Sequence, residues 1–193
     1  MKFKCFSYGS VKSTNSSAMY LIKKKNYHNG FIRATSQKKG RGRHGKKWIS
    51  KKGNFFSTIF FQIKKDYPSV EQFTTINSLL NIDVIKNYCG KNKINFKPPN
   101  DILVNNKKIC GILQEVITKD KNKYLIVGIG INLVTNPKIK KYISTNIYKE
   151  TNIKPDLNKI SEQVLKKYEN FFKNIKKYNF SKFKLKSKKL ALC

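Results

Sequence analysis

Residues 55–63 read Phe-Phe-Ser-Thr-Ile-Phe-Phe-Gln-Ile and form the most strand-like stretch of the chain. Aromatic and β-branched residues are enriched in strands, and a short apolar run that follows a turn is typical of a buried strand. Gly53-Asn54 supplies that turn. The stretch therefore predicts a central strand with a sheet built around it.

The segments before this strand predict more of the same sheet and one helix. Apolar alternation and turn residues identify the strands, and a hydroxyl residue ahead of an apolar stripe marks a helix start. In chain order we expect a strand over 3–8, a helix capped by Ser13 or Thr14 and running to 25, a turn at 29–30 and a strand over 31–35.

The segments after the central strand alternate between helix and strand patterns. Apolar residues at intervals of three and four predict helices over 70–85 and from Asp156 to 175. We expect strands over 94–97, 101–104, 109–117 and 124–133, with Asn105-Asn106 as a tight hairpin turn. The segment after Tyr178 fits either a strand or a frayed end. The fold class predicted is α+β, a mixed and largely antiparallel sheet backed on one face by helices.

Composition limits the kinds of protein this can be. The formal charge of +32 in 193 residues is compatible with a nucleic acid, a membrane surface or an acidic protein as partner. The lysines are scattered through every segment, however, which favours the interpretation that a compositional bias places lysine at solvent-facing positions. The cysteines form no C-x-x-C pair and only two histidines occur, so we expect free thiols and no metal cluster. No signal peptide or membrane span is recognised, and we expect a cytoplasmic location.

A glycine-arginine loop carries the strongest functional signal. Only three arginines occur, Arg33, Arg41 and Arg43, and two of them lie in Gly40-Arg-Gly-Arg-His-Gly45. Arginine presents a planar fork to phosphate or carboxylate, and glycine lets backbone amides approach an anion. Residues 40–46 also fit the start of a phosphate-binding P-loop, but Lys47 offers no hydroxyl to magnesium and no helix pattern follows. The loop therefore predicts an anion site of another kind.

Five motifs in order then resemble one family, the biotin protein ligases. They are S-T-N at 13–15, Q-x-x-G-R-G-R-x-G-x-x-W at 37–48, a variant of K-W-P-N-D at 97–101, K-x-x-G-I-L-x-E at 108–115 and G-x-G-I-N at 128–132. The resemblance implies the sheet-and-helix fold that these ligases share with class II aminoacyl-tRNA synthetases. It also implies a catalytic domain over 1–180, with 181–193 as a short tail or a remnant of a C-terminal domain.

The family's activity implies two steps, ATP and biotin as substrates, and Mg²⁺. Biotin and ATP would form biotinyl-5'-AMP, and the biotinyl group would pass to a lysine of a biotin carboxyl carrier protein domain. We expect catalytic roles for Arg41, Arg43 and Lys108, and a magnesium ligand in Asp101. The residues expected to bind biotin are Ser13, Thr14, Asn15, Gln37, Gly40, Arg41, Gly42, Arg43, Lys108, Gly111 and Gly128. Those expected to bind ATP or the adenylate are Arg43, Trp48, Lys97, Asn100, Asp101 and Asn132.

Several of these residues also have an ordinary structural interpretation. Ser13 fits a helix cap, Asp101 a turn, Trp48 a core position and Lys97 a solvated strand position. His44 has no partner in view, so we expect it to be exposed and without a catalytic role.

The chain departs from the family pattern at three positions. Lys12 stands where Asp is frequent, Pro98 replaces a Trp, and Lys46 fills a position often held by Arg. The few residues before Ser13 leave no room for a helix-turn-helix, so we expect no specific DNA binding; we also expect no membrane partner and leave a homodimer open. Two alternatives stay open, a lipoate-attachment enzyme of the same fold and a basic nucleic-acid-binding module.

Overall fold

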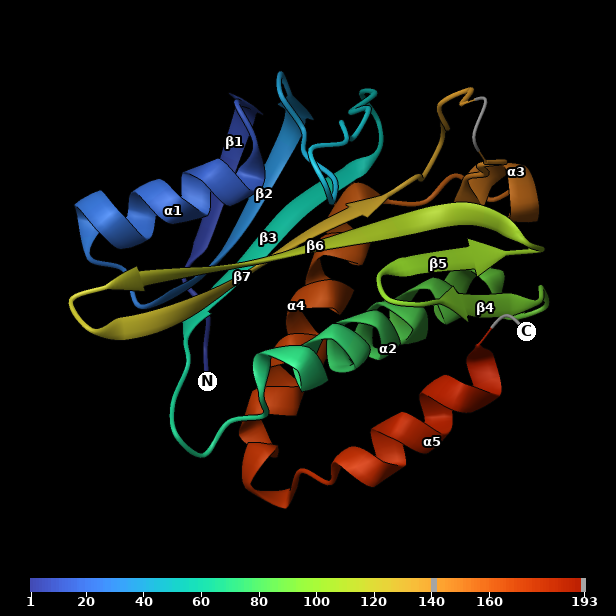
Figure 1. Cartoon of the computed structure of the whole chain (residues 1–193). Helices are drawn as coiled ribbons and strands as arrows, with labels where there is room; N and C mark the ends of the chain where they lie inside the picture. Colours follow the sequence, from blue (N-terminus) through green and yellow to red (C-terminus); the bar gives the residue numbers. More distant parts are fainter. Residues whose placement is uncertain (140–141, 192–193) are drawn as a thin grey trace.

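The computed structural model describes residues 1–139 and 142–191, which form one mixed sheet with helices on both faces (Figure 1). The strands are β1 (Cys5–Val11), β2 (Asn29–Gln37), β3 (Phe55–Gln62), β4 (Ile94–Lys97), β5 (Asp101–Val104), β6 (Lys107–Lys119) and β7 (Asn122–Ile131). The helices are α1 (Thr14–Lys25), α2 (Val70–Cys89), α3 (Ile147–Thr151), α4 (Leu157–Lys173) and α5 (Phe180–Leu190), with a 3₁₀ turn at Ile175–Lys177.

The sheet has the strand order β1-β2-β3-β7-β6-β5-β4. Only β1 and β2 run parallel, and every other neighbouring pair is antiparallel. β3 lies between β2 and β7, and its side chains are buried from Phe55 to Phe61. The predicted central strand and the predicted α+β class are therefore confirmed.

The two faces of the sheet are covered by different helices because successive strand residues point to opposite sides. Phe31, Ile59 and Phe61 belong to the main core with α2 and α4, whereas Ile32 and Phe60 pack with α1 in a second, smaller core. Helices on one face only were expected, and that expectation is wrong for α1. Its apolar residues are few, so the sequence did not reveal which face they meet.

Local signals set most element ends as predicted. Ser13 caps α1 by accepting a hydrogen bond from the Ser16 amide, and Asp156 caps α4. Asn105 and Asn106 both have positive φ, as a tight β5–β6 hairpin turn requires. The expected turn at 29–30 is wrong, since both residues already pair with β3. Glycine is needed at position 30 because the Phe60 ring lies close to its backbone, and a Cβ there would be only 2.6 Å from that ring.

The segment after Tyr178 forms helix α5, not a strand or a frayed end. Its apolar residues Phe183 and Leu190 pack against the main core, and Lys186 pairs with Asp83 of α2 at 2.7 Å. Residues 192–193 of the expected tail lie outside the described part. Across residues 1–139 and 142–191, no helix combines the length and the apolar character that crossing a membrane needs.

Candidate active site

A cavity of about 730 Å³ lies on the face of the sheet that carries α1, where the strands are not covered by a helix. The start of α1, the 37–48 loop, the β4–β5 turn, β6 and β7 all contribute to its wall. The fold thus brings the five sequence motifs together. Of the predicted site residues, only Gly40 and Asn132 do not line this cavity. Gly40 lies beneath the loop, where a Cβ would meet the Trp48 carbonyl, and Asn132 borders a small adjoining pocket.

One end of the cavity is lined by polar groups that fix one another. The Gln37 carbonyl oxygen accepts from the Thr14 amide at 2.8 Å and from the Thr14 hydroxyl at 3.1 Å. The Gln37 amide nitrogen donates to Ser50 Oγ at 3.0 Å. The carbonyl of Gln37 is therefore already engaged, and its second N–H is the group left to meet a ligand.

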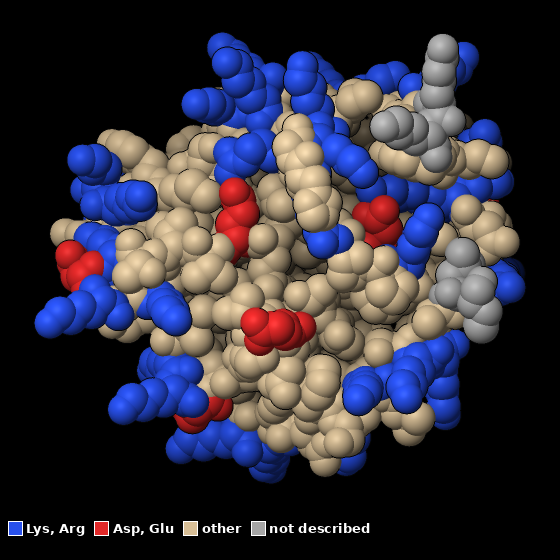
Figure 2. Space-filling model, viewed as in Figure 1, with Lys and Arg blue, Asp and Glu red and all other residues tan. Residues whose placement is uncertain are grey.

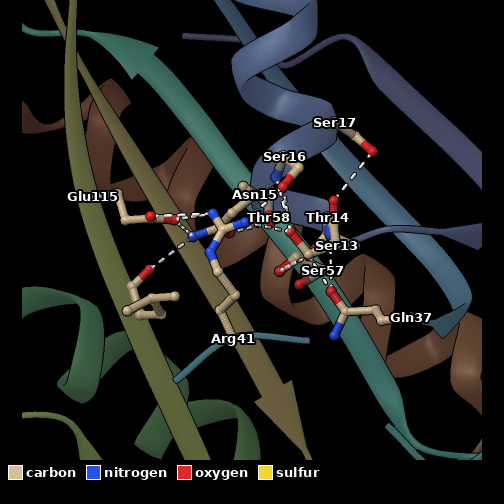
Figure 3. A network of polar contacts seen from close by, with 11 residues as sticks. Ser13, Thr14, Asn15, Ser16, Ser17, Gln37, Arg41, Ser57, Thr58 and Glu115 are labelled. Carbon is tan, nitrogen blue, oxygen red and sulfur yellow. Dashed lines mark hydrogen bonds and ion pairs between the residues drawn. The ribbon is translucent and has the colours of Figure 1, made fainter. Parts of the chain in front are cut away.

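Asn15 is fixed in the same wall by hydrogen bonds to two strands, β3 and β6. Its amide donates to Glu115 Oε2 at 2.7 Å and to the Leu113 carbonyl, and its oxygen accepts from Thr58 Oγ1 at 2.6 Å (Figure 3). A Cβ on Gly128 would collide with this amide, so glycine is needed for the close approach. Asn15 is thus a buried, preoriented part of the wall.

Arg41 reaches across the cavity wall to Glu115 and to the start of α1. Its Nη2 lies 2.8 and 3.1 Å from the two carboxylate oxygens of Glu115, and its Nη1 donates to the hydroxyls of Ser13 and Ser16 (Figure 3). Arg43 contacts Asn100 Oδ1 at 3.4 Å. In the part of the chain that the structure describes, no carboxylate pairs with Arg43.

Trp48 lies against a pair of glycines in neighbouring strands. Gly111 of β6 and Gly130 of β7 are register partners, and a Cβ on either would come within about 2.6 Å of the Trp48 ring. The indole Nε1 is buried without a hydrogen-bond partner among the described residues. The missing side chains of the two glycines therefore make the space for the Trp48 ring.

The opposite end of the cavity is built around Lys108. Its ammonium lies 2.8 Å from Asp101 Oδ1, 5.6 Å from the Trp48 ring centre and 5.0 Å from the Tyr142 ring centre. The Lys108 backbone pairs with Ile143 and Thr145, which places Tyr142 over the side chain. Asn132 fixes the same segment by donating to the Thr145 carbonyl at 2.9 Å.

Lys97 and His44 both line the cavity and are exposed, as was expected for His44. Arg33 lies elsewhere, because its side chain donates to Asn158 of α4 on the other face of the sheet. The clustering of three arginines in sequence thus does not correspond to a cluster in space.

Residues 8–132 match the family model described as the Biotin/lipoate A/B protein ligase family. The chain belongs to this family. The match covers more than half of the chain and includes all five motifs that line or border the cavity. It also confirms the resemblance that the motifs indicated.

Curated relatives point the same way. The bifunctional ligase/repressor BirA of Bacillus subtilis is 29% identical over 191 residues, covering 94% of this chain and 58% of its own length. A biotin--[acetyl-CoA-carboxylase] ligase of Paracoccus denitrificans is 32% identical over 55% of this chain and 45% of its own length. The chain thus spans little more than half of the Bacillus relative that it matches.

Solved structures of the family share the fold. A biotin protein ligase from Aquifex aeolicus in complex with biotin and ATP is 28% identical, with a TM-score of 0.82 over 98% of this chain and 78% of that chain. One from Leishmania major in complex with biotinyl-5-AMP is 21% identical with a TM-score of 0.84, over 98% of this chain and 81% of that chain, which supports the fold alone.

Sequence reasoning missed several residues of the site in this family member. Glu115 was part of a matched motif but received no role, although it pairs with both Arg41 and Asn15. Glu115 lies two residues after Leu113, which lines the cavity, and residues two apart in a strand point to the same face. This spacing was the signal that could have identified Glu115. Tyr142 and Thr58 carried no such signal, since their contacts come from distant segments.

Proposed function

We propose that this chain is an ATP-dependent ligase that forms biotinyl-5'-AMP and transfers the biotinyl group to a lysine of a biotin carboxyl carrier protein domain. The observation that carries the proposal is the single cavity that joins a polar, hydrogen-bonded end at Thr14 and Gln37 to a cationic end at Arg43 and Lys108. Membership of the family and the ligands of the Aquifex structure support it.

The chemistry explains why both ends are needed. A carboxylate is a poor acyl donor, and joining it to the α-phosphate of ATP with release of pyrophosphate makes AMP the leaving group. Negative charge shifts between the carboxylate and phosphate oxygens during that step, so cations fixed beside them lower the barrier. Arg43 and Lys108 are the residues placed to supply this charge.

The polar end would bind the ureido ring of biotin. The half-buried Gln37 side chain is held in place by hydrogen bonds to Thr14 and Ser50, which leaves its second N–H for a ligand. Leaving such a shielded donor unpaired costs about 1–3 kcal/mol. Lipoate has an apolar dithiolane ring that offers this N–H no partner. The cavity thus favours biotin over lipoate.

Magnesium would enter with ATP as part of the nucleotide substrate. Mg²⁺ is usually bound by one or two carboxylates together with substrate phosphates. Asp101 is the carboxylate nearest to that end, and it already pairs with Lys108 at 2.8 Å. No cluster of three acidic, histidine or cysteine groups occurs among the described residues, which fits a metal held mainly by phosphate oxygens. The role of Asp101 as a direct metal ligand stays a prediction.

The decisive experiment mixes the protein with ATP, magnesium and either biotin or lipoate and looks for the acyl-adenylate by mass spectrometry. We expect biotinyl-5'-AMP with biotin and at most a trace product with lipoate. A carrier domain added afterwards should gain the biotinyl mass on one lysine. Equal products from both acids would contradict the specificity, and no adenylate from either would contradict the ligase proposal.

A further inference from the structure

The two arginines of the glycine-arginine loop have different partners, although they are only two residues apart. Arg41 contacts both carboxylate oxygens of Glu115 and two hydroxyls at the start of α1, whereas Arg43, among the described residues, hydrogen-bonds only to the Asn100 side chain. The side chains of Arg41 and Glu115 are 35% and 27% exposed, so their pairing is partly shielded from water. One arginine is therefore already committed within the protein, and the other is available to a ligand.

The cationic guanidinium of Arg41 lies at the start of α1, where a negative partner is needed to stabilise it. Its Nη1 contacts Ser13, the N-cap of α1, and Ser16 in the first turn. A helix N-terminus carries a partial positive charge, which repels a cation, and the first turn of α1 contains no acidic residue. Glu115 supplies the compensating negative charge at that point.

Glu115 is itself oriented by its surroundings. Asn15 donates to its Oε2 at 2.7 Å, and Asn15 is fixed in turn by Thr58 of β3 (Figure 3). The carboxylate therefore faces the loop from a rigid wall made by α1, β3 and β6. A rigid acceptor reduces the entropy lost when Arg41 pairs with it.

The loop between Gly40 and Trp48 is a small unit with its own hydrogen bonds. Gly42 N donates to the Lys46 carbonyl at 2.7 Å, Trp48 N donates to the Gly40 carbonyl at 3.0 Å, and Arg41 and Lys47 form a β-bridge. The unit can therefore keep its shape while it moves relative to the sheet. Its main side-chain attachments to the sheet and α1 are the Arg41–Glu115 pair and the Trp48 ring on the glycine pair.

We propose that Arg41 is a positioning residue and that Arg41 and Glu115 form a latch, which fixes the glycine-arginine loop over the cavity. Arg43 is then the arginine of the loop that meets the carboxylate and phosphate of the substrates. The kinetic part of this inference rests on the proposed ligase function, but the structural part does not. Breaking the latch should open the loop and weaken binding, whereas removing Arg43 should slow the chemical step with the loop still closed.

The chain carries its own probe for loop position, because Trp48 is the only tryptophan. Acrylamide quenching of its fluorescence in the unliganded protein reports how well the ring is covered. We expect Arg41→Met and Glu115→Gln each to raise the quenching constant about twofold or more, and the double variant to match the single ones because both remove one interaction. Arg43→Met and the off-site control Arg33→Met should quench like the parent.

The kinetic arm separates positioning from charge. We expect Arg41→Met and Glu115→Gln to raise the KM for biotin about tenfold with a smaller change in kcat, and Arg43→Met to lower kcat with a smaller change in KM. Arg41→Lys keeps the charge but cannot reach the four oxygens that Arg41 contacts, so it should behave like Arg41→Met. Circular dichroism confirms that each variant is folded; because Glu115→Gln is nearly isosteric, it tests the latch if Arg41→Met fails to fold.

Clear results would overturn the latch. Parent-like quenching and KM in Glu115→Gln, or a loss of kcat in Arg41→Met that Arg41→Lys restores, would make Arg41 a charge donor to the substrate. If the parent itself forms no biotinyl-AMP, the ligase proposal fails, and the latch is then decided by the quenching measurements alone.

Discussion

Single residues of the same type take different roles here because their partners differ. Arg33 donates to Asn158 on the far face of the sheet, Arg41 pairs with Glu115, and Arg43 has a neutral neighbour in Asn100. All three carry the same planar guanidinium, so their surroundings distinguish them. Glu115 separates Arg41 from the other two, and its place on the cavity wall separates Arg43 from Arg33. Arg43 is therefore the one suited to an anionic substrate.

Lys108→Ala tests the cationic end of the cavity. Removal of an ammonium that faces developing negative charge should slow adenylate formation about 100-fold or more. The fold should survive with a loss of about 1–3 kcal/mol, because the main core is untouched but the buried Asp101 Oδ1 loses its partner. Pyrophosphate release measures the first effect and thermal unfolding the second. Unchanged pyrophosphate release would show that Lys108 does not act on the reacting groups.

Arg43→Ala tests retention of the intermediate. With no carboxylate beside it among the described residues, Arg43 can bind the adenylate phosphate, and its removal should speed the release of free biotinyl-AMP about tenfold or more. Filter-bound radiolabelled adenylate measures the release rate, and Arg33→Ala provides the matched control. Equal release rates in variant and parent would remove Arg43 from this role.

At the scale of elements, the β6–β7 pair positions the tryptophan of the loop. Gly111 and Gly130 lie opposite each other, and their missing side chains make room for Trp48. This arrangement links a strand motif to a loop motif that is far from it in sequence. Gly130 of G-x-G-I-N is therefore needed for packing against Trp48, whereas Gly128 makes room for the Asn15 side chain.

Gly130→Ala should displace Trp48, because the new Cβ would lie 2.5 to 2.8 Å from three atoms of the indole ring. We expect stronger acrylamide quenching, faster adenylate release and a loss of about 1–3 kcal/mol of stability from overpacking. Gly9→Ala in β1 is the matched control, since no atom lies within 4 Å of its Cβ. Parent-like Trp48 fluorescence in Gly130→Ala would mean that the ring is free to move aside.

A second element, the segment from Tyr142 to Thr145, is held by Glu150 of α3. The Glu150 side chain is 6% exposed and accepts from Thr145, Asn105 and Lys107. Burial by itself would raise the pKa of this carboxyl, but those hydrogen bonds and the Lys107 charge lower it below its ordinary value of 4.5. Glu150 thus ties the segment that covers Lys108 to the β5–β6 hairpin.

Glu150→Gln tests whether Glu150 holds this segment, and its effect on stability should depend on pH. A carboxyl with a lowered folded-state pKa stabilises the protein above its ordinary pKa, and this contribution is lost as the pH falls through the folded-state value. At neutral pH the variant should be less stable by about 1–2 kcal/mol. The difference should shrink below about pH 4.5. Unfolding temperatures of both proteins across this range measure it, and a difference independent of pH would contradict the tie.

At the scale of the whole molecule, the dominant feature is positive charge. Lysine and arginine total 42 against 10 acidic residues, and Figure 2 shows Lys and Arg crowding the upper edge of the face that it presents. Several of the acidic residues are already paired with lysine or arginine, so they offset cations locally. Such a field attracts ATP and any acidic carrier domain.

Ionic strength should therefore change the rate at which an acidic carrier associates with the protein more than the rate of the chemical step. Raising the salt from about 0.05 M to about 0.5 M shortens the screening length several-fold, and kcat/KM for an acidic carrier should fall about tenfold with kcat nearly constant. Steady-state kinetics at several salt concentrations measure this. A constant kcat/KM would show that the lysines are only filler at solvent-facing positions.

The sequence by itself determined the strands, the helix caps and the family. These depend on local propensity and on the spacing of motif residues, such as Ser13 ahead of α1 and the asparagine pair in the β5–β6 turn. The clearest local failures were the turn expected at 29–30 and the helix after Tyr178, where the chain pattern fitted more than one structure.

Only the tertiary structure decided the face on which α1 packs, the docking of α5 and the partner of each arginine. Glu115 lies 74 residues from Arg41, and nothing in the local pattern of either residue specifies the other. Such pairs are set by which side chains share one face of the sheet and by how closely glycines let segments approach. Contacts of that kind depend on the packing of the whole chain, so they become visible only once the sheet is assembled.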